Sequence, residues 1–331
     1  MNVVIIGPGK MGQAHAKALK QTACALTAVL PSSSDSKSLS SFLELFPGTP
    51  VLDNIDDVIA SAATWDAVYI CCPTKFTIFY LQKLAPLNKL IFAEKPVATD
   101  TKEFITVAGR SNIFVGYNRR HYENISKFRE LIKQHPPTLV SVVIPESSAL
   151  GQHENKILPQ LVYENSAHVF DLLFYLFGLV SWEYGVKYRD GNGTLESITA
   201  LGVVGEQRFV PINLSMCFDS ADNFSITATN KAYRFQLKPL EILTVYSGTE
   251  VVEPSPESPI RSYQPIQVAK YLAESTAGLK PGFLEQTREL KGTFEGRNRQ
   301  RIGASIEDAV KAIESIESLV SKLKASDASR D

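Results

Sequence analysis

A glycine-rich turn near the N-terminus constrains this chain most strongly, because it stands between a strand-like run (3–7) and a helix-like segment (11–21). In a G-x-G-x-x-G turn the first glycine makes the tight bend and the second lets the backbone approach a pyrophosphate. The third packs the helix on the strand, and the phosphates lie at the helix N-terminus. We therefore expect dinucleotide binding, against the alternative of a turn without a ligand, by Gly7, Gly9, Lys10, Met11 and Gly12.

Strand-like and helix-like segments alternate through the first 118 residues. Strands are expected at 3–7, 25–30, 66–72, 89–94 and 112–118, and helices at 11–21, 38–46, 76–84 and 99–109. Such alternation predicts βαβ units and a parallel, right-handed, doubly wound sheet. Ligands of these sheets bind beyond the carboxyl ends of the strands.

The pattern changes after about Asn118. Helices are expected at 121–134, 161–178 and 305–323, and a strand at 138–145. Several strand-like runs joined by turn residues fill the stretch from 182 to 248. Consecutive strands with short turns predict an antiparallel sheet, so the second half is expected to be a separate α+β domain.

Composition excludes several classes of function. The 331 residues include 34 basic and 35 acidic side chains and no polybasic face, so we expect neither nucleic-acid nor membrane binding. The N-terminal apolar run is too short for a signal peptide, and no run reaches the roughly 18 residues of a spanning helix. Four cysteines without C-x-x-C spacing are expected to be buried and reduced, which suits the cytoplasm. We expect no metal site.

The end of the second predicted strand bears on cofactor choice. A site that prefers NAD usually carries an acid there to bind the ribose hydroxyls. Here the strand runs instead into Pro31 and Ser32, with Asp35 and Lys37 nearby. Ser32 is expected to contact the cofactor, and small hydroxyls with Lys37 could accommodate a 2′-phosphate. We therefore expect NAD or NADP, with NADP at least as favoured as NAD.

Lys95 follows the predicted strand 89–94 in the stretch AEKPVATD. The proline after it restricts its backbone, which fixes where the ammonium points. Beside a bound nicotinamide the ammonium could hydrogen-bond a substrate oxygen and stabilise alkoxide character. Taken alone, a solvated lysine paired with Glu94 is the better explanation, since most lysines are surface charges.

A second polar group lies on the apolar helix expected at 161–178. Spacings of four and three place Glu164, His168 and Asp171 on one face, so the carboxylates could orient the imidazole. A histidine there could exchange a proton near neutral pH. The alternative is a packed histidine, although burying three polar groups without a task is costly.

Arg119 and Arg120 follow the last predicted Rossmann strand. Two arginines could clamp an acidic substrate, or they could bridge the domains. Together with Asn165 and Asp171 they are the expected substrate-binding residues. His15, on the first helix, is expected to be packed rather than catalytic.

Together these motifs resemble the Gfo/Idh/MocA oxidoreductase family, the group of glucose-fructose oxidoreductase and inositol dehydrogenase. The resemblance rests on GPGKMG, DAVYICCPT, AEKPVATD, VGYNRRH and ENSAHVFDLL, in that order. It implies a Rossmann domain, placed here at 1–118, and a C-terminal α+β domain with a large open-faced, mainly antiparallel sheet at 119–331. That second domain is expected to bind substrate and to form a homodimer or homotetramer.

The resemblance also assigns roles. It implies a catalytic Lys95, a proton-exchanging His168 and a supporting Glu164, where the family often has aspartate. Ser166 occupies a position where the family commonly has glycine. Near the nicotinamide the resemblance places Pro73, Thr74, Glu94 and Lys95.

The expected activity is hydride transfer between NAD(P) and a secondary alcohol or ketone of a sugar, inositol or sugar nucleotide. Two alternatives stay open. One is an epimerase or eliminase that returns the hydride from tightly bound NAD, and the other is a non-enzymatic nucleotide-binding sensor.

Overall fold

The structure is a computed structural model that describes residues 1–31, 37–151, 156–206, 209–275, 278–297 and 300–325. The chain divides into two compact units. The first comprises Met1–His121, Ala167–Leu172 and Ser275–Glu314, and the second comprises Tyr122–Ser166, Leu173–Glu274 and Ser315–Asp331. The first unit thus takes in two segments that lie beyond the predicted boundary at residue 118.

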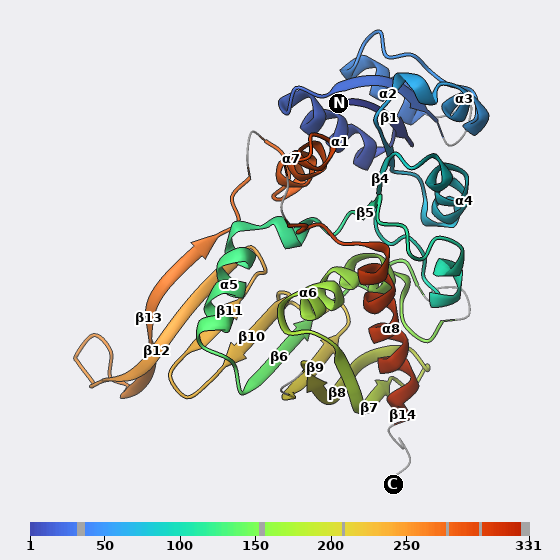
Figure 1. Cartoon of the computed structure of the whole chain (residues 1–331). Coiled ribbons are helices and arrows are strands. Elements are labelled where there is room, and N and C mark those ends of the chain that lie inside the picture. The colour runs from blue at the N-terminus through green and yellow to red at the C-terminus, as the bar shows by residue number, and fades with distance from the viewer. Residues whose placement is uncertain (32–36, 152–155, 207–208, 276–277, 298–299, 326–331) are drawn as a thin grey trace. The chain divides into compact units, whose positions relative to one another are not determined.

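The first unit is built on a five-stranded parallel sheet (Figure 1). Its order is β2-β1-β3-β4-β5, with β1 Asn2–Ile6, β2 Ala25–Leu30, β3 Ala67–Ile70, β4 Leu90–Ala93 and β5 Ile113–Val115. Every neighbouring pair is parallel, as the alternating sequence predicted. The sheet reverses its winding between β1 and β3, where doubly wound folds bind their ligands.

Helices cover this sheet because apolar side chains recur on one side of each. The bounds are α1 Lys10–Gln21, α2 Lys37–Leu45, α3 Ile55–Ala60, α4 Thr74–Leu84 and α7 Phe283–Phe294. Three of these were predicted, whereas α3 and α7 were not. The segment expected as a helix at 99–109 forms only a 3₁₀ turn, Thr101–Thr106, since threonine and isoleucine lower its helix propensity.

The second unit contains a nine-stranded sheet, ordered β13-β12-β11-β10-β6-β9-β8-β7-β14. Its strands are β6 Leu139–Ile144, β7 Val180–Arg189, β8 Leu195–Val204, β9 Val210–Cys217, β10 Ser225–Thr229, β11 Arg234–Leu237, β12 Ile242–Val252, β13 Ser262–Leu272 and β14 Leu323–Ala325. The pairs β6 with β9 and β7 with β14 are parallel, and the rest are antiparallel. The predicted mainly antiparallel sheet is confirmed.

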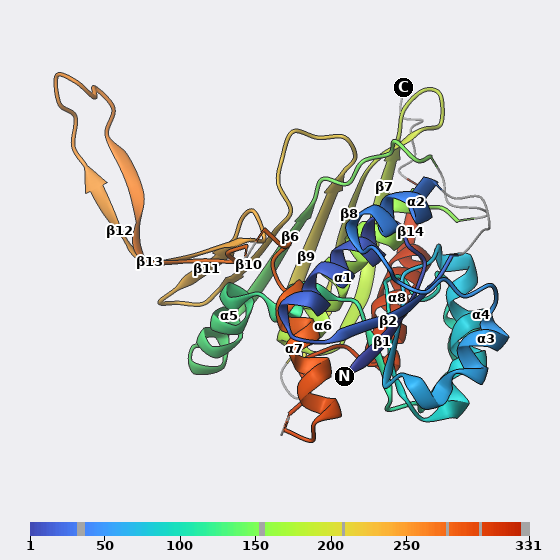
Figure 2. The same ribbon diagram turned by 90° about the horizontal axis from the view of Figure 1, so that it is seen from above.

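One face of this sheet is covered and the other is open. Alternate residues of β6, β8 and β9 are buried, which is the pattern of a sheet with one packed face. Helix α5, Glu123–Gln134, lies on the packed face, and β12 with β13 extends as a long hairpin (Figures 1 and 2). Cys217 lies exposed at the end of β9, so the prediction that the thiols are buried is wrong for this residue.

The helix expected at 161–178 is divided in two. A π-helical turn, Val162–Ser166, precedes α6, Ala167–Phe177, which ends at Gly178 with a φ of 92°. The helix expected at 305–323 is confirmed as α8, Ile306–Lys322. Its start is capped reciprocally by Ser305 and Asp308, each accepting from the other's backbone N–H.

The described residues contain no helix long and apolar enough to cross a membrane. Within the same residues no group of three or more histidine, cysteine or acidic side chains is arranged to hold a metal ion.

Candidate functional site

The glycine turn shows why each of its glycines is needed. Gly7 has a φ of +96°, and a Cβ there would meet the Cys71 carbonyl oxygen at 2.7 Å. A Cβ on Gly12 would stand 2.1 Å from the Gly7 carbonyl oxygen. By contrast, a Cβ on Gly9 would meet nothing within 4 Å. Two glycines are therefore required by packing, whereas Gly9 borders open space into which a ligand can come close to the backbone.

The N-terminus of α1 supplies the second half of a phosphate cradle. Gly9 caps the helix without a side-chain hydrogen bond, and the first turn contains no acidic residue. Lys10 and Met11 begin that turn. Orphan N–H groups and the positive helix end favour an anion, so the residues present fit the pyrophosphate of a dinucleotide.

A pocket of about 430 Å³ lies beside the end of β2. Its lining comprises Leu30, Pro31, Leu39, Val51, Leu52, Asp53, Asn54, Ile55, Phe79 and Tyr80. The mixture of apolar walls and a few polar groups suits a nucleoside. Ser32, predicted to contact the cofactor, lies outside the described residues, whereas Lys37 is the exposed first residue of α2.

The predicted nicotinamide-side residues follow β3 and β4, which are neighbours in the sheet. Ile70 pairs with Ala93, and the Glu94 N–H donates to the Ile70 carbonyl at 2.8 Å. Pro73 and Thr74 lie where α4 begins, just after β3. These residues, the glycine turn and Lys95 therefore all follow the carboxyl ends of the three adjacent strands β1, β3 and β4.

The Glu94 side chain is held inside the unit rather than toward solvent. It is 8% exposed, and its Oε1 lies 2.6 Å from Nε2 of His15, which is fully buried. Its Oε2 accepts from the Lys95 backbone N–H at 3.2 Å. His15 also stacks on Phe283 of α7, with ring centroids 4.7 Å apart. The prediction that His15 is packed is confirmed, and its partner is the residue before Lys95.

His168, the second residue of α6, is 6% exposed and lies edge-on to Tyr117. Burial lowers the pKa of His168 well below its ordinary value, and the positive charges of Lys95, Arg119 and Lys280 lower it further. Its Nδ1 makes no hydrogen bond with the described residues. The structure therefore brings Lys95 and His168 into one electrostatic environment and keeps the imidazole neutral.

Lys280 was missed from the sequence. It belongs to the segment Ser275–Glu314 of the first unit, and Asn118 donates to the carbonyl of the following Pro281 at 3.0 Å. The only available signal was a Lys-Pro pair like Lys95-Pro96, and the sequence has another such pair at Lys238-Pro239. Nothing in the sequence places that pair near His168, because the two are more than a hundred residues apart.

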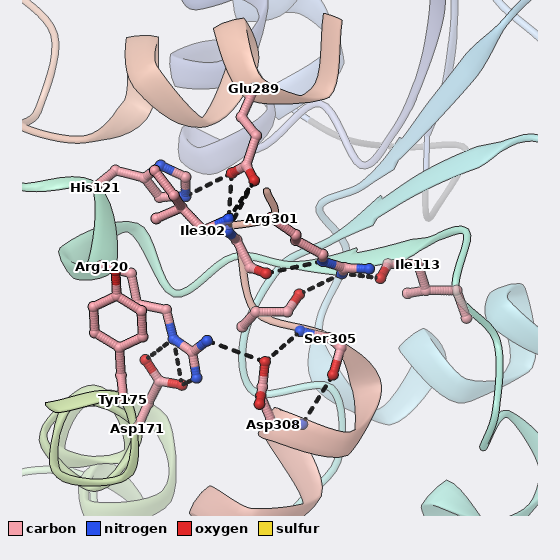
Figure 3. Close-up of polar contacts among 12 residues, drawn as sticks. Ile113, Arg120, His121, Asp171, Tyr175, Glu289, Arg301, Ile302, Ser305 and Asp308 are labelled. Carbon is pink, nitrogen blue, oxygen red and sulfur yellow. Dashed lines mark hydrogen bonds and ion pairs between the residues drawn. The ribbon is translucent and has the colours of Figure 1, made fainter. Parts of the chain in front are cut away.

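Arg120 joins three separate segments of the first unit (Figure 3). Its Nε and Nη2 donate to both oxygens of Asp171, the shortest contact being 2.6 Å, and its Nη1 donates to Asp308 at 3.0 Å. Although burial opposes its charge, pairing with Asp171 raises the pKa of Arg120 above its ordinary value. Substrate binding by Arg120 and Asp171 stays a prediction. The structure gives each of them a buried protein partner instead, and it directs Asp171 to Arg120 rather than to the imidazole.

Removing one partner of this buried pair is expected to be costly. Asp171→Ala removes the carboxylate that accepts from both Nε and Nη2 of the buried guanidinium, so the free energy of unfolding should fall by about 3–5 kcal/mol in urea titrations. The double variant Arg120→Met/Asp171→Leu is the matched control and should recover much of that loss, because apolar residues replace both charges. A loss below about 1 kcal/mol for Asp171→Ala would contradict a structural role for the pair.

A neighbouring network holds the segment before α8 against β5. Glu289 accepts from the backbone N–H of Ile302 and Gly303, and Arg301 donates to the carbonyl oxygens of Ile113 and Ala304 (Figure 3). Burial lowers the pKa of His121 to about 3, so the imidazole beside Glu289 is neutral at physiological pH.

The predicted residues before His168 lie in the second unit. Glu164 and Asn165 are half-buried members of the π-helical turn. Gln160 Nε2 donates to Glu164 at 2.5 Å, and Asn165 Nδ2 donates to Glu146 at 3.0 Å. The supporting role of Glu164 toward His168 stays a prediction.

Residues 1–112 match the family GFO_IDH_MocA, described as an oxidoreductase family with an NAD-binding Rossmann fold. Inositol 2-dehydrogenase of Rhizobium meliloti is 27% identical over 184 residues, which is 53% of this chain and 54% of that protein. The match therefore spans about half the length of this curated relative.

Solved structures of similar fold cover nearly the whole chain. Scyllo-inositol dehydrogenase from Lactobacillus casei, solved with NAD(H) and scyllo-inositol, has a TM-score of 0.71 and 18% identity and covers 98% of this chain and 96% of its own. UDP-N-acetylglucosamine 3-dehydrogenase from Acidithiobacillus ferrooxidans has a TM-score of 0.71 and 14% identity, with 98% and 97% covered. At these low sequence identities, the similarity establishes the fold and not the activity.

The glycine cradle, the switch point between β1 and β3 and the open mixed sheet define a Rossmann-fold oxidoreductase architecture. Residues 1–112 match the Gfo/Idh/MocA oxidoreductase family, as the sequence motifs predicted.

Proposed function

We propose that this protein is an NAD(P)-dependent oxidoreductase that moves a hydride between nicotinamide and a secondary alcohol or ketone of an inositol or sugar. The observation that carries this proposal is the buried, neutral His168 in the field of Lys95. A neutral imidazole can take a proton from a hydroxyl, and a nearby ammonium can stabilise the negative charge that develops on the oxygen. Bound nicotinamide supplies the hydride acceptor or donor at its C4 carbon.

Each polar residue then has a distinct task. In alcohol oxidation His168 accepts the hydroxyl proton while Lys95 donates a hydrogen bond to the same oxygen. In ketone reduction His168 returns that proton. Glu94 and His15 hold the backbone at Lys95, and Arg119 contributes positive charge beside His168. Glu164 is proposed to support the imidazole, as the family resemblance implies.

The substrate proposal draws on the relatives. Two of them carry inositol in their names, and a third acts on the sugar of a nucleotide. Their shared chemistry is a ring bearing secondary hydroxyls. We therefore propose an inositol or a sugar for this chain, without choosing between NAD and NADP.

A direct test is turnover of a small panel by purified protein. Myo-inositol, scyllo-inositol and glucose would each be incubated with NAD⁺ or NADP⁺, and absorbance at the reduced nicotinamide band would be followed. Mass spectrometry of the protein as purified would identify any carried cofactor. Steady reduction of one cofactor with one polyol supports the proposal. Product formed without net reduction favours the epimerase or eliminase, and no chemistry with any pair counts against the proposal.

Gly9 offers a test of cofactor binding that is independent of turnover. Gly9→Ala should leave the free energy of unfolding nearly unchanged, because the added Cβ meets nothing within 4 Å and the residue has φ −65°. The methyl should obstruct the pyrophosphate, so the Kd for NADH measured by fluorescence is expected to rise by about tenfold or more. Gly191→Ala is the surface control, because a Cβ there also meets nothing within 4 Å. Unchanged NADH affinity in Gly9→Ala would place the dinucleotide elsewhere.

We also propose that the protein forms a homodimer or homotetramer through the second unit. Exposed large apolar side chains occur on β7, β8 and β13, namely Tyr184, Tyr188, Leu201, Tyr263, Ile266 and Val268. Such exposure is typical of interaction surfaces. Light scattering at micromolar concentration should give a multiple of the 36.5 kDa chain, and Leu201→Lys/Ile266→Lys should lower that mass. A monomeric mass for the unsubstituted protein contradicts this expectation.

A further inference from the structure

Glu146 is a buried carboxylate that the proposed chemistry does not use. It lies just after β6 and is 3% exposed. Its Oε1 accepts from the Ser147 backbone N–H at 3.0 Å. Its Oε2 accepts from Asn165 Nδ2 at 3.0 Å and from the Ser166 hydroxyl at 2.7 Å. No ion pair joins it to a basic side chain of the described residues. A carboxylate buried without a cation is costly, so its three donors call for an explanation.

The donors place Glu146 against one short piece of backbone. Asn165 and Ser166 are adjacent in the π-helical turn Val162–Ser166, which leads directly into the helix that carries His168. Turns of this kind are often found at functional sites. Ser166 stands where the family commonly has glycine, and its fully buried hydroxyl is one of the two donors to Oε2. In this chain the serine at position 166 therefore helps to hold the Glu146 carboxylate.

The contact also fixes the polarity of the Asn165 amide. An ionised carboxylate accepts hydrogen bonds and cannot donate them, so the amide must turn its NH₂ group toward Glu146. The amide oxygen Oδ1 then faces away, and the described residues donate no hydrogen bond to it. Because the Asn165 side chain is only half-buried, that oxygen can accept from a molecule outside the chain.

We propose that Glu146 is a positioning residue that makes Asn165 a specificity determinant, presenting Oδ1 as an acceptor for a substrate hydroxyl. This rests on the proposed function and narrows its substrate class to neutral polyols. A hydroxyl can donate to Oδ1, whereas a methyl ether at the same position cannot. An ionised carboxylate or phosphate group has no hydrogen to donate, so at this position it would leave Oδ1 without a hydrogen bond.

Reversing the polarity of the pair tests this assignment. In Glu146→Gln the new amide can donate to Asn165 Oδ1, which turns the Asn165 NH₂ group outward. Asn165→Asp places two carboxylates together. In the double variant Glu146→Gln/Asn165→Asp, the amide introduced at position 146 donates to the new carboxylate, and an acceptor again faces outward. Glu183→Gln, an exposed residue of β7, is the matched control.

The readout is the ratio of kcat/KM for myo-inositol to kcat/KM for mono-O-methyl-inositols, with KM and kcat reported separately. For at least one ether the wild-type ratio should be large and should fall about tenfold or more in Glu146→Gln, mainly through the KM for myo-inositol. The double variant should regain most of the ratio, and Glu183→Gln should not change it. A purely structural role would alter stability without altering this ratio. Ratios that are equal in wild type and Glu146→Gln overturn the proposal.

A second measurement separates this inference from the proposed function. A double-mutant cycle in urea needs no substrate, and it should show the single variants to be less stable and the double variant to recover. If wild type turns over none of the polyols, the proposed function fails. If the cycle shows no coupling between residues 146 and 165, the positioning inference fails whatever the enzyme turns over.

Discussion

Replacing Lys95 with methionine is expected to lower kcat by about 10²-fold to 10³-fold, the typical loss when one charge-stabilising donor is removed from an active site. Methionine keeps the length of the side chain and removes the ammonium. The Kd for NADH should change little, because the glycine cradle on β1 and α1 is untouched. Stopped-flow or steady-state turnover with the best polyol, together with NADH fluorescence titration, measures both quantities.

Lys83→Met, at an exposed position on α4, is the matched control and should retain full turnover. The Lys95 variant should also change the proton affinity of His168. Since the charge of Lys95 contributes to the lowered pKa of His168, removing it should move the acid limb of the residual kcat/KM profile to higher pH. A profile that does not move would show that the two side chains are not electrostatically coupled.

Substitution of His168 by asparagine is expected to lower kcat by about 10²-fold to 10⁴-fold, as loss of a general base typically does. In wild type the neutral form of His168 is the base. The pKa of His168 is lowered well below the ordinary value of about 6.5. The imidazole should therefore still be neutral at pH 6.5, and kcat/KM for alcohol oxidation should fall only at lower pH. An acid limb centred above pH 6.5 would contradict the neutral-imidazole mechanism.

The same shift has a consequence for stability with a definite sign. Below about pH 6.5 the unfolded chain protonates residue 168, whereas the folded chain does not until its lower pKa is reached. The unfolded state therefore binds more protons in that interval, and the free energy of unfolding should fall as the pH decreases. His168→Asn should flatten part of this dependence in urea titrations. His121, with its pKa near 3, should contribute in the same direction.

Local patterns in the sequence predicted most of the first unit, because each strand and turn depends on residues that are neighbours in the sequence. Apolar runs followed by turn residues predicted the five parallel strands, and the spacing of the glycines predicted the phosphate cradle at the start of α1. The helix expected at 99–109 was wrong, because threonine and isoleucine lower the helix propensity of this segment and the structure forms only a 3₁₀ turn. Helix α3 was not predicted, although the sequence contains its capping box, in which Asn54 and Asp57 each accept from the other's backbone N–H.

Long-range contacts could not be predicted from the sequence. The sequence around His15 does not predict that its partner is Glu94, since 79 residues separate the two. The pairing of Arg120 with Asp171 and the three donors on Glu146 are likewise products of tertiary structure. The spacing of Glu164, His168 and Asp171 assumed a continuous α-helix, whereas a π-helical turn and the buried guanidinium assign these residues to different partners.

The first unit is assembled from pieces of chain that are far apart in the order of synthesis. Helix α7 packs its Phe283 on His15, and Ala304 bridges to Val115 at the edge of β5. A ribosome releases residues 275–314 only after almost everything else, so the nucleotide-binding unit cannot be completed while the chain is still short. A fragment ending at His121 would expose the apolar surface that α7 covers. The dinucleotide-binding part of this protein should therefore resist excision as a contiguous N-terminal piece, and nascent chains stalled before residue 275 should be substrates for chaperones.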